Sequence, residues 1–224
     1  MPVFLLDKSL NFPHPRYAEP NGLLAVGGDL RVERLLSAYQ GGIFPWYSEE
    51  SPILWFSPDP RLVLIPDQFK VSTSLRKVMK SNTFVVKFDT CFAQVIVQCA
   101  MAERKGQDGT WITNDMVEAY IKLHREGYAH SVETFHEDQL VGGLYGVSLG
   151  GAFFGESMFH TRNNASKAAL YHLVERLKSK DFDFIDSQVP TEHLKSFGAK
   201  EVGRDSFLKM LGQTLRRETI RGKW

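Results

Sequence analysis

The sequence predicts an α+β or mixed α/β fold, with a regular C-terminal part and an irregular N-terminal part. Three strand-like runs, SVETFH, LVGGLYGV and GAFFGESMF, follow one another with only short turn sequences between them. A helical pattern over 164–178 and the strand-like run FDFIDSQV come next. Hairpins that are followed by a helix and a further strand are typical of a mixed sheet. Proline marks the other part, because nine of the ten prolines lie between Pro2 and Pro66.

The proline-rich N-terminal part is expected to form a small domain over 1–66 that is mostly extended loop. Proline fixes φ and removes a backbone donor, so it interrupts regular structure. One helix is expected within this domain, over 31–40, with Asp29 as its cap and a Gly-Gly pair after its last residue.

The remaining 67–224 are expected to form the second domain. Its helices and strands are predicted from apolar residues at helical or alternating spacing, and Thr113 is expected to cap one of the helices. The glycines of the central strands indicate a bulge or a close approach of a ligand to the backbone; tight turns and helix packing are the alternative. The expected elements are helices over 72–80, 92–99, 113–126, 164–178, near 194 and over 206–217, and strands from 83, over 131–136, 140–147, 151–159 and 182–189.

Composition excludes several classes of protein. The 27 Lys and Arg balance 26 Asp and Glu, so bulk charge gives no nucleic-acid signal and any such site must be local. Cys91 and Cys99 are the only cysteines, which excludes a disulfide scaffold or a cysteine-built zinc site and suits a reducing cytoplasm. The seven histidines show no metal-like pairing, so we expect no metal. No basic, apolar leader and no membrane-spanning run is visible.

Two predicted strands carry polar groups among apolar neighbours. Strict alternation would place Glu156 on one face with Phe154 and Met158, and would group Asp186 with Gln188. A carboxylate beside an apolar pocket is costly unless it is paired, and such places are often functional. A structural salt bridge from Glu156 to a nearby basic residue, or a helix cap, would explain the same pattern.

Tryptophans and a basic C-terminal segment are the remaining signals for nucleic acid. Aromatic side chains on loops stack on unpaired bases, although they also fill gaps in irregular domains. The basic segment 209–224 would meet phosphate, or would form an ordinary solvated helix end. The four tryptophans are Trp46, Trp55, Trp111 and Trp224.

The residues alone leave two other functions open. An acyl-CoA-dependent N-acetyltransferase has a similar order of hairpin, helix and strand, but the turn FHTRNNASK lacks the glycines that would hold a pyrophosphate. A nucleic-acid-binding adaptor would use the tryptophans as base platforms and carry no chemistry.

Several segments together closely resemble the bacterial leucyl/phenylalanyl-tRNA–protein transferases. They span about 19–199 and their order and content are highly specific. Two small departures, Phe56 where the family often has Trp and Ser187 where Cys is common, change no reactive group. The matching segments are EPNGLLAVGGDL, YQGGIFPWYS, WFSPDPR, GTWIT, VGGLYGV, FFGESMF, NNASKAAL and DFIDSQVPTEHLKSFGA.

The resemblance implies a small N-terminal domain followed by an acetyltransferase-like (GNAT-like) C-terminal domain. It also implies an activity: transfer of Leu or Phe, and less well Met, from aminoacyl-tRNA to the α-amine of proteins that begin with Arg or Lys. The product would enter N-end rule degradation. No cofactor is implied, and we expect a cytoplasmic monomer.

The resemblance also implies roles for residues. Asp186 and Gln188 would lie at the reacting centre, with Asp186 acting on the amine directly or through Gln188. Glu156 would hold the basic acceptor residue or the ester end, and the tRNA ribose hydroxyl would be another route for the proton. Trp46 and Trp111 would hold the terminal adenosine. Spacing and resemblance together predict an apolar aminoacyl pocket lined by Leu144, Met158, Leu170, Leu173 and Ile185.

Overall fold

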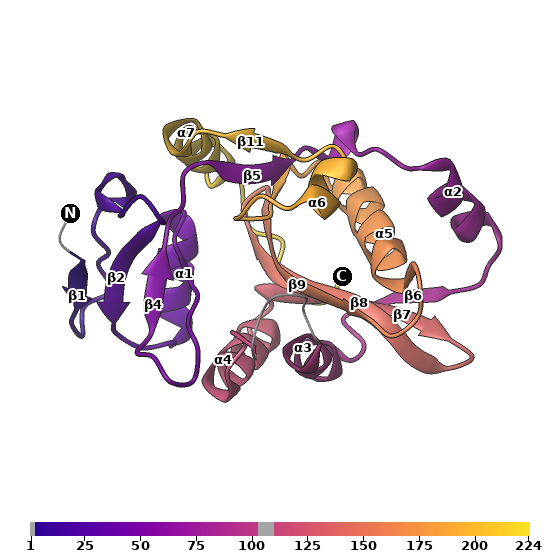
Figure 1. Ribbon diagram of the computed structural model, residues 1–224, viewed down its shortest axis with the longest axis horizontal. Helices are drawn as coiled ribbons and strands as arrows, with labels where there is room; N and C mark the ends of the chain where they lie inside the picture. The colour runs from indigo at the N-terminus through magenta and orange to yellow at the C-terminus, as the bar shows by residue number, and fades with distance from the viewer. Residues whose placement is uncertain (1–2, 103–109) are drawn as a thin grey trace.

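The computed structural model describes residues 3–102 and 110–224. Its strands form a four-stranded sheet of order β1-β2-β4-β3 and a seven-stranded sheet of order β11-β5-β10-β9-β8-β7-β6. The two sheets belong to a small N-terminal unit and a larger C-terminal unit, which lie side by side in Figure 1. The expected α+β class with a small N-terminal domain is therefore confirmed.

The N-terminal unit is more regular than proline content suggests. Its sheet contains β1 (Phe4–Leu6), β2 (Leu23–Gly27), β3 (Phe44–Pro45) and β4 (Leu54–Phe56). More than half of the described residues before 66 lie outside helices and strands, as expected, but short strands from distant parts of the chain also pair with one another, as β1 does with β2 in parallel. Pro45 lies in β3, an edge strand of this sheet, where a residue without an N–H does not interrupt the hydrogen bonds between strands.

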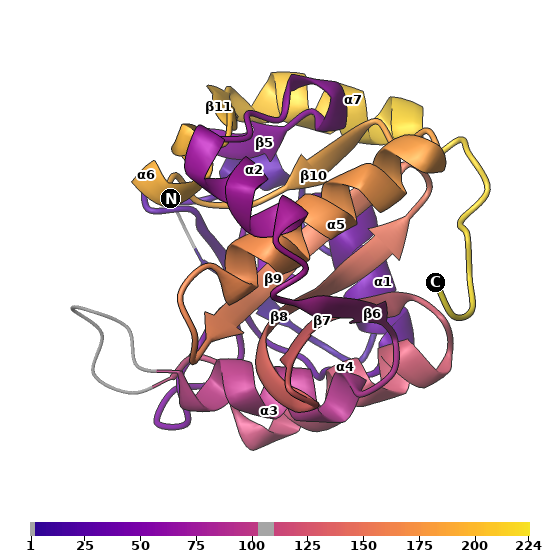
Figure 2. The ribbon, with the colours of Figure 1, turned by 90° about the vertical axis from the view of Figure 1, so that its right-hand side faces the viewer.

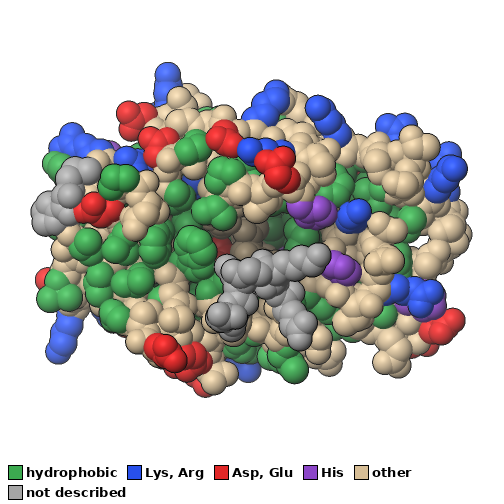
Figure 3. Space-filling model, viewed as in Figure 1, with side chains coloured by type: hydrophobic (Ala, Val, Ile, Leu, Met, Phe, Trp, Pro, Cys, Tyr) green, Lys and Arg blue, Asp and Glu red, His purple; other side chains and the backbone are tan. Residues whose placement is uncertain are grey.

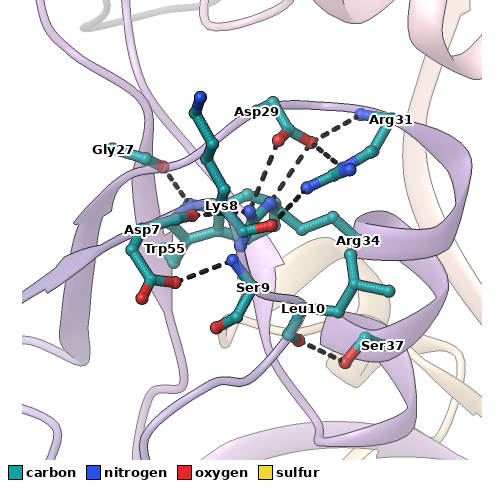
Figure 4. A network of polar contacts seen from close by, with 10 residues as sticks. All are labelled: Asp7, Lys8, Ser9, Leu10, Gly27, Asp29, Arg31, Arg34, Ser37 and Trp55. Atoms are coloured by element: carbon teal, nitrogen blue, oxygen red, sulfur yellow. Dashed lines mark hydrogen bonds and ion pairs between the residues drawn. The ribbon is translucent and has the colours of Figure 1, made fainter.

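The N-terminal unit also carries α1 (Val32–Gln40), which begins after Arg31 rather than at an Asp29 cap. Asp29 instead accepts a hydrogen bond from the Arg31 N–H and pairs with the fully buried Arg34. Arg34 also donates to the carbonyl of Asp7 at 2.8 Å. This network, drawn in Figure 4, fixes α1 against the loop after β2 and against the N-terminal segment.

The seven-stranded sheet forms the centre of the C-terminal unit. The predicted hairpins are confirmed: β7 pairs with β8 and β8 with β9, both antiparallel, and Glu137 and Asp138 at the first turn have positive φ. β5 belongs to this sheet, although it precedes the expected boundary at 66. The strands are β5 (Arg61–Leu64), β6 (Val85–Phe88), β7 (Ala129–His136), β8 (Gln139–Leu149), β9 (Ala152–His160), β10 (Phe184–Asp186) and β11 (Lys200–Val202).

Helices cover both faces of the larger sheet (Figures 1 and 2). The side chains of Ser72, Thr113 and Thr191 cap the helices that follow them, so the expected Thr113 cap is confirmed. Short 3-10 turns lie at Pro15–Tyr17 and Pro66–Gln68. The helices of this unit are α2 (Thr73–Lys80), α3 (Phe92–Met101), α4 (Asn114–Arg125), α5 (Ala165–Ser179), α6 (Glu192–Ser196) and α7 (Arg204–Thr214).

The sheet separates two apolar cores. The core on the α5 side includes Leu144, Phe153 and Ile185. The core on the α3 and α4 side includes Val147 and Phe154 and continues into the N-terminal unit. The N-terminal unit is thus packed on the larger one by shared apolar burial, the main favourable contribution to such an interface.

β9 contains a bulge in its middle. Tyr145 pairs with Ser157, but the next residue, Gly146, pairs with Gly155, so Glu156 is the extra residue. The prediction that glycines mark a bulge is confirmed. A Cβ at Gly146 would lie 2.2 Å from the carbonyl oxygen of Phe154, so this close approach needs glycine.

The bulge overturns one expectation about side-chain faces. Phe154 lies in the core on the α3 side, whereas Met158 packs against the core on the α5 side. The two therefore do not share a face, because one extra residue reverses the alternation. The strand expected over 182–189 also ends early, at Asp186, and Gln188 has φ +55.

β9 and β10 separate beside a cavity. The two strands run parallel and pair only from Phe184 with Ala152 to Asp186 with Phe154. Beyond this point β9 continues to His160 beside β8, while the chain after Asp186 turns away. The opening between them is the entrance to a cavity.

Candidate active site

A cavity of about 370 Å³ lies where β9 and β10 part. Hydrophobic side chains gather on both sides of the central hollow on this face (Figure 3). Nine of the ten site residues selected from the sequence line the cavity, and Asp186 is not among the described lining residues. The nine are Trp46, Trp111, Leu144, Glu156, Met158, Leu170, Leu173, Ile185 and Gln188.

The inner part of the cavity is apolar. β8 provides Leu144 and β9 provides Met158, and these two residues pair directly across the strands. Leu170 and Leu173 come from α5, and Ile185 comes from β10. All but Met158 are nearly completely buried, at 3% exposure or less. A preformed wall of this kind, with one flexible thioether, suits a branched or aromatic hydrocarbon side chain.

Two tryptophans from different parts of the chain line the cavity. Trp46 follows β3 in the N-terminal unit, and its ring meets that of Phe56 edge-on with centroids 5.5 Å apart. Trp111 precedes α4. Both rings are partly exposed, so they offer aromatic faces to a bound molecule.

The other two tryptophans serve packing. Trp55 is completely buried and donates through Nε1 to the carbonyl of Gly27 at 2.9 Å. Trp224 stacks on the ring of His130 at a centroid distance of 4.1 Å. In the basic segment near Trp224, Arg217 pairs with Asp183 and Arg221 donates to the carbonyl of Glu126, so these two cations make contacts within the protein.

Glu156 is held at the polar end of the cavity by three side chains. Tyr39 donates to Oε1 at 2.8 Å and Tyr120 donates to Oε2 at 3.2 Å. The amide Nε2 of Gln188 donates to Oε1 at 3.3 Å. The alternatives of a basic partner or a helix cap for Glu156 are therefore not observed among the described residues.

Hydrogen counting indicates that Glu156 readily carries a proton. Tyr39 and Tyr120 are also hydrogen-bonded to each other. The three contacts are those between the two tyrosine hydroxyls and from each hydroxyl to Glu156, and each needs one hydrogen. When the carboxylate is ionised, the two phenols supply only two hydrogens, whereas a protonated Glu156 supplies the third hydrogen. Burial raises the pKa of Glu156 to about 7, and the nearby Asp186 charge adds to the rise, although the two tyrosine hydrogen bonds oppose it.

The two tyrosines themselves stay protonated. Burial, together with the neighbouring Glu156 charge, raises the pKa of Tyr39 and of Tyr120 well above the usual value near 10. They act as fixed donors around a carboxyl that can exchange its proton near neutral pH.

Asp186 lies behind the cavity in a buried ion pair with Arg61. The Nε and Nη2 atoms of Arg61 donate to its two oxygens at 2.9 and 2.7 Å, and neither side chain is exposed. Arg61 also donates to the carbonyl of Gly42, and its guanidinium lies 4.5 Å from the ring centroid of Phe207. Both oxygens of Asp186 are thus engaged by Arg61.

Gln188 connects the two carboxyl groups. Its backbone N–H donates to Oδ1 of Asp186 at 2.9 Å, and its side chain reaches Glu156. The left-handed backbone of Gln188 makes this possible, because it turns the side chain back toward β9. Of the expected arrangement, the link from Asp186 through Gln188 is present, and it leads to Glu156.

Sequence reasoning missed Tyr39, Tyr120 and Arg61 as site residues. The two tyrosines appear in the sequence as apolar-face positions of helices, and Arg61 is one basic residue among 27 Lys and Arg. A hydroxyl on an otherwise apolar helix face is the signal that would have suggested a buried polar partner.

No helix in the described ranges, 3–102 and 110–224, combines the length and apolar character that crossing a membrane requires.

Two solved structures that resemble the chain do so at low sequence identity. An aminoglycoside acetyltransferase from an uncultured soil metagenomic sample matches with a TM-score of 0.38 and 15% identity, over 53% of this chain and 86% of that one. L-PGS from Bacillus licheniformis matches with a TM-score of 0.43 and 13% identity, over 90% and 65%.

Sequence relatives are much closer. A leucyl/phenylalanyl-tRNA–protein transferase of Anaeromyxobacter sp. strain Fw109-5 is 55% identical over 224 residues, which is all of this chain and 95% of the relative. One from Syntrophobacter fumaroxidans is 58% identical over 215 residues, 96% of this chain and 92% of the relative. The leucyl/phenylalanyl-tRNA protein transferase family model matches 63–212, and the model of its N-terminal domain matches 28–59. The chain belongs to the leucyl/phenylalanyl-tRNA protein transferase family.

Proposed function

We propose that this protein transfers Leu or Phe, and less readily Met, from aminoacyl-tRNA to the α-amine of proteins that begin with Arg or Lys. The modified protein would then enter N-end rule degradation. The observation that carries the proposal is the cavity itself: an apolar chamber that ends at a partly exposed carboxyl whose pKa is raised to about 7. Membership of the transferase family supports the same reaction.

The reaction is aminolysis of an ester. The acceptor nitrogen attacks the carbonyl carbon of the aminoacyl ester, an amide bond forms, and the bond from that carbon to the ribose oxygen breaks. The amine loses a proton and the ribose oxygen gains one. A general base works best when its pKa is close to the working pH, and an α-amine with a pKa of about 7.7–8.0 needs little help.

We assign the base to Glu156. Its carboxylate accepts the amine proton, and Tyr39 and Tyr120 keep it oriented through the hydrogen bonds to its two oxygens. The same negative charge attracts the cationic acceptor. Among the described residues of the cavity wall, Glu156 alone carries a carboxyl group, and its pKa is raised to about 7.

Gln188 and Asp186 act in positioning. The Gln188 amide donates to Glu156 and orients the ester beside it. Asp186 holds the Gln188 backbone, and Arg61 holds Asp186. Fixed donors of this kind cost no reorganisation when charge develops in the transition state.

The aminoacyl side chain occupies the apolar chamber, and the terminal adenosine stacks at Trp46 or Trp111. Proteins commonly recognise unpaired RNA ends by stacking on aromatic rings. The Leu144, Met158, Leu170, Leu173 and Ile185 wall has no hydrogen-bonding groups in its side chains, which favours hydrocarbon over polar amino acids. Size alone discriminates against Val, which is one methylene shorter than Leu, by only about 1–3 kcal/mol, and Ile is an isomer of Leu, so rejection of both depends on shape.

We further propose that the protein acts as a monomer in the cytoplasm, without a cofactor. The two cysteines are both free, which suits a reducing compartment.

The test is transfer of labelled Leu from leucyl-tRNA to two peptides that differ only in an initial Arg or Ala. Labelling of the Arg peptide alone is expected. Equal labelling of both peptides would overturn the acceptor specificity. Acetyl-CoA consumption without aminoacyl transfer would point to an N-acetyltransferase, and tRNA binding without transfer to an adaptor.

A further inference from the structure

A second cavity adjoins the first one. Its volume is about 690 Å³, and it shares Met158 and His193 with the aminoacyl cavity. Its other described lining residues come mainly from the end of β9 and the start of α5. The proposed function leaves this second cavity without an occupant, although it is the larger of the two.

Basic groups converge on the second cavity. His160, Lys167 and His193 line it, and no acidic side chain is among its described lining residues. Burial lowers the pKa of His193, and the nearby Lys167 and His160 lower it further, so both of these residues lie close to His193. No ion pair neutralises Lys167 among the described residues. The cavity therefore has a net positive field that an anion would relieve.

Neutral donors complete the wall. Asn163, Asn164 and Ser166 also line the cavity. The Asn164 side chain makes no capping hydrogen bond to α5, a helix of 15 residues, so its first-turn N–H groups add to the positive field. The turn contains no glycine, so it lacks the close backbone approach that a pyrophosphate cradle uses. A single phosphate fits this set of long side-chain donors better.

We propose that the second cavity binds the phosphodiester that precedes the terminal adenosine of the aminoacyl-tRNA. This inference rests on the proposed function, which places that adenosine in the first cavity. The phosphodiester is bonded to the 5′ oxygen of the same adenosine, so it must lie within one nucleotide of the first cavity. The shared residues Met158 and His193 put the basic cavity at that position. Lys167 provides the charge, His160 lies beside it on the cavity wall, and the contact fixes the ester over Glu156.

The experiment compares two small substrates that differ by one phosphate. One is 3′-O-phenylalanyl-adenosine, and the other is the phenylalanyl ester of the dinucleotide cytidylyl-adenosine. Both are given to the full-length protein with an Arg-starting peptide. We expect kcat/KM for the dinucleotide to exceed that for the nucleoside by about tenfold or more. An effect of this size corresponds to one charge-assisted hydrogen bond. A dinucleotide with a neutral methylphosphonate link should behave like the nucleoside.

Three variants locate the contact. Lys167→Gln and His160→Gln should each reduce the ratio of the two kcat/KM values toward one. Lys180→Gln, at the other end of α5, is the matched control and should leave the ratio unchanged. The ratio cancels any loss of folded protein, because both substrates meet the same enzyme. The rate with the dinucleotide should also depend on salt more steeply than that with the nucleoside, and Lys167→Gln should remove the difference.

Two outcomes would overturn the proposal. If Lys167→Gln and His160→Gln keep the wild-type ratio, the phosphate lies elsewhere. If the methylphosphonate substrate matches the phosphodiester, the cytosine and not the charge is recognised. Failure of the nucleoside itself to donate Phe to the Arg peptide would instead count against the proposed function. In that case binding of the corresponding non-reactive 3′-amides, measured by calorimetry, still gives the ratio for each variant.

Discussion

Arg61 and Asp186 form a two-point ion pair from which water is excluded. The two donor–acceptor distances are 2.9 and 2.7 Å, and both side chains are completely buried. This pairing commits Asp186 to a structural partner and leaves Glu156 as the carboxyl group on the cavity wall. In the proposed mechanism the two acidic residues therefore have different roles, since Asp186 positions Gln188 whereas Glu156 exchanges protons.

Breaking this ion pair should cost more stability than replacing it. We expect Asp186→Asn to lower the free energy of unfolding by about 3–5 kcal/mol, because Arg61 would keep an uncompensated buried charge. The double variant Arg61→Met/Asp186→Leu should recover much of that loss. Urea unfolding of the three proteins measures both effects. An Asp186→Asn protein as stable as the wild type would show that water reaches Arg61.

Glu156→Gln should lower kcat about 100-fold or more, since general-base catalysis contributes on that scale. In the wild type the rate should rise with pH up to about 7, where Glu156 becomes ionised. The variant should lose this rise and keep only the dependence on the acceptor amine, near pH 7.7–8.0. Glu133→Gln, another buried carboxyl whose pKa is raised by burial, is the control outside the cavity. Equal profiles for wild type and Glu156→Gln would remove Glu156 from the proton transfer.

The same group should make stability depend on pH. The pKa of Glu156 is higher in the folded chain than the ordinary value of 4.5, so the folded state binds the proton more tightly. Its contribution to stability is therefore complete below about pH 4.5 and is lost as pH rises through about 7. Relative to Glu156→Gln, the wild type should lose stability between pH 5 and pH 8, as measured by urea unfolding. A constant difference across that range would contradict the raised pKa.

Trp46→Ala and Trp111→Ala should weaken the use of leucyl-tRNA and phenylalanyl-tRNA to the same degree. A ring that stacks on adenine contributes about 1–3 kcal/mol and does not sense the attached amino acid. Measuring the two specificity constants for each variant tests this, with Trp224→Phe as a control at a ring outside the cavity. A large change in the Leu-to-Phe ratio would place that tryptophan in the aminoacyl chamber.

Met158→Ala should shift preference toward Phe. The change enlarges the chamber opposite Leu144, and the lost contact should harm the smaller Leu more than Phe, by about 1–3 kcal/mol. Competition between leucyl-tRNA and phenylalanyl-tRNA for one Arg-starting peptide gives the ratio. Preference for Arg over Ala acceptors should stay the same. An unaltered Leu-to-Phe ratio would mean that the substrate side chain does not contact Met158.

The elements of the larger unit could be predicted because their signals are local. Hairpin turns, the Thr113 cap and apolar periodicity are all contained within a few residues. The face on which Glu156 lies could not be predicted, because the bulge is set by strand pairing with Gly146 and not by the β9 sequence alone. The partners of Glu156 were equally inaccessible, since Tyr39 and Tyr120 are 117 and 36 residues away along the chain.

The hydrogen bond from Tyr39 to Glu156 joins the small N-terminal unit to the cavity of the larger one, and under the proposed mechanism it makes that unit a component of the chemistry. α1 carries Tyr39 to the larger unit, so the hydrogen bonds around Glu156 are complete only when the two units are packed together. A compound that wedges the units apart would therefore inhibit without entering the cavity, and it would do so by releasing one of the two phenolic donors. Inhibitors of this kind would not have to compete with the hydrophobic aminoacyl group, which makes the seam between the units a separate target on the same enzyme.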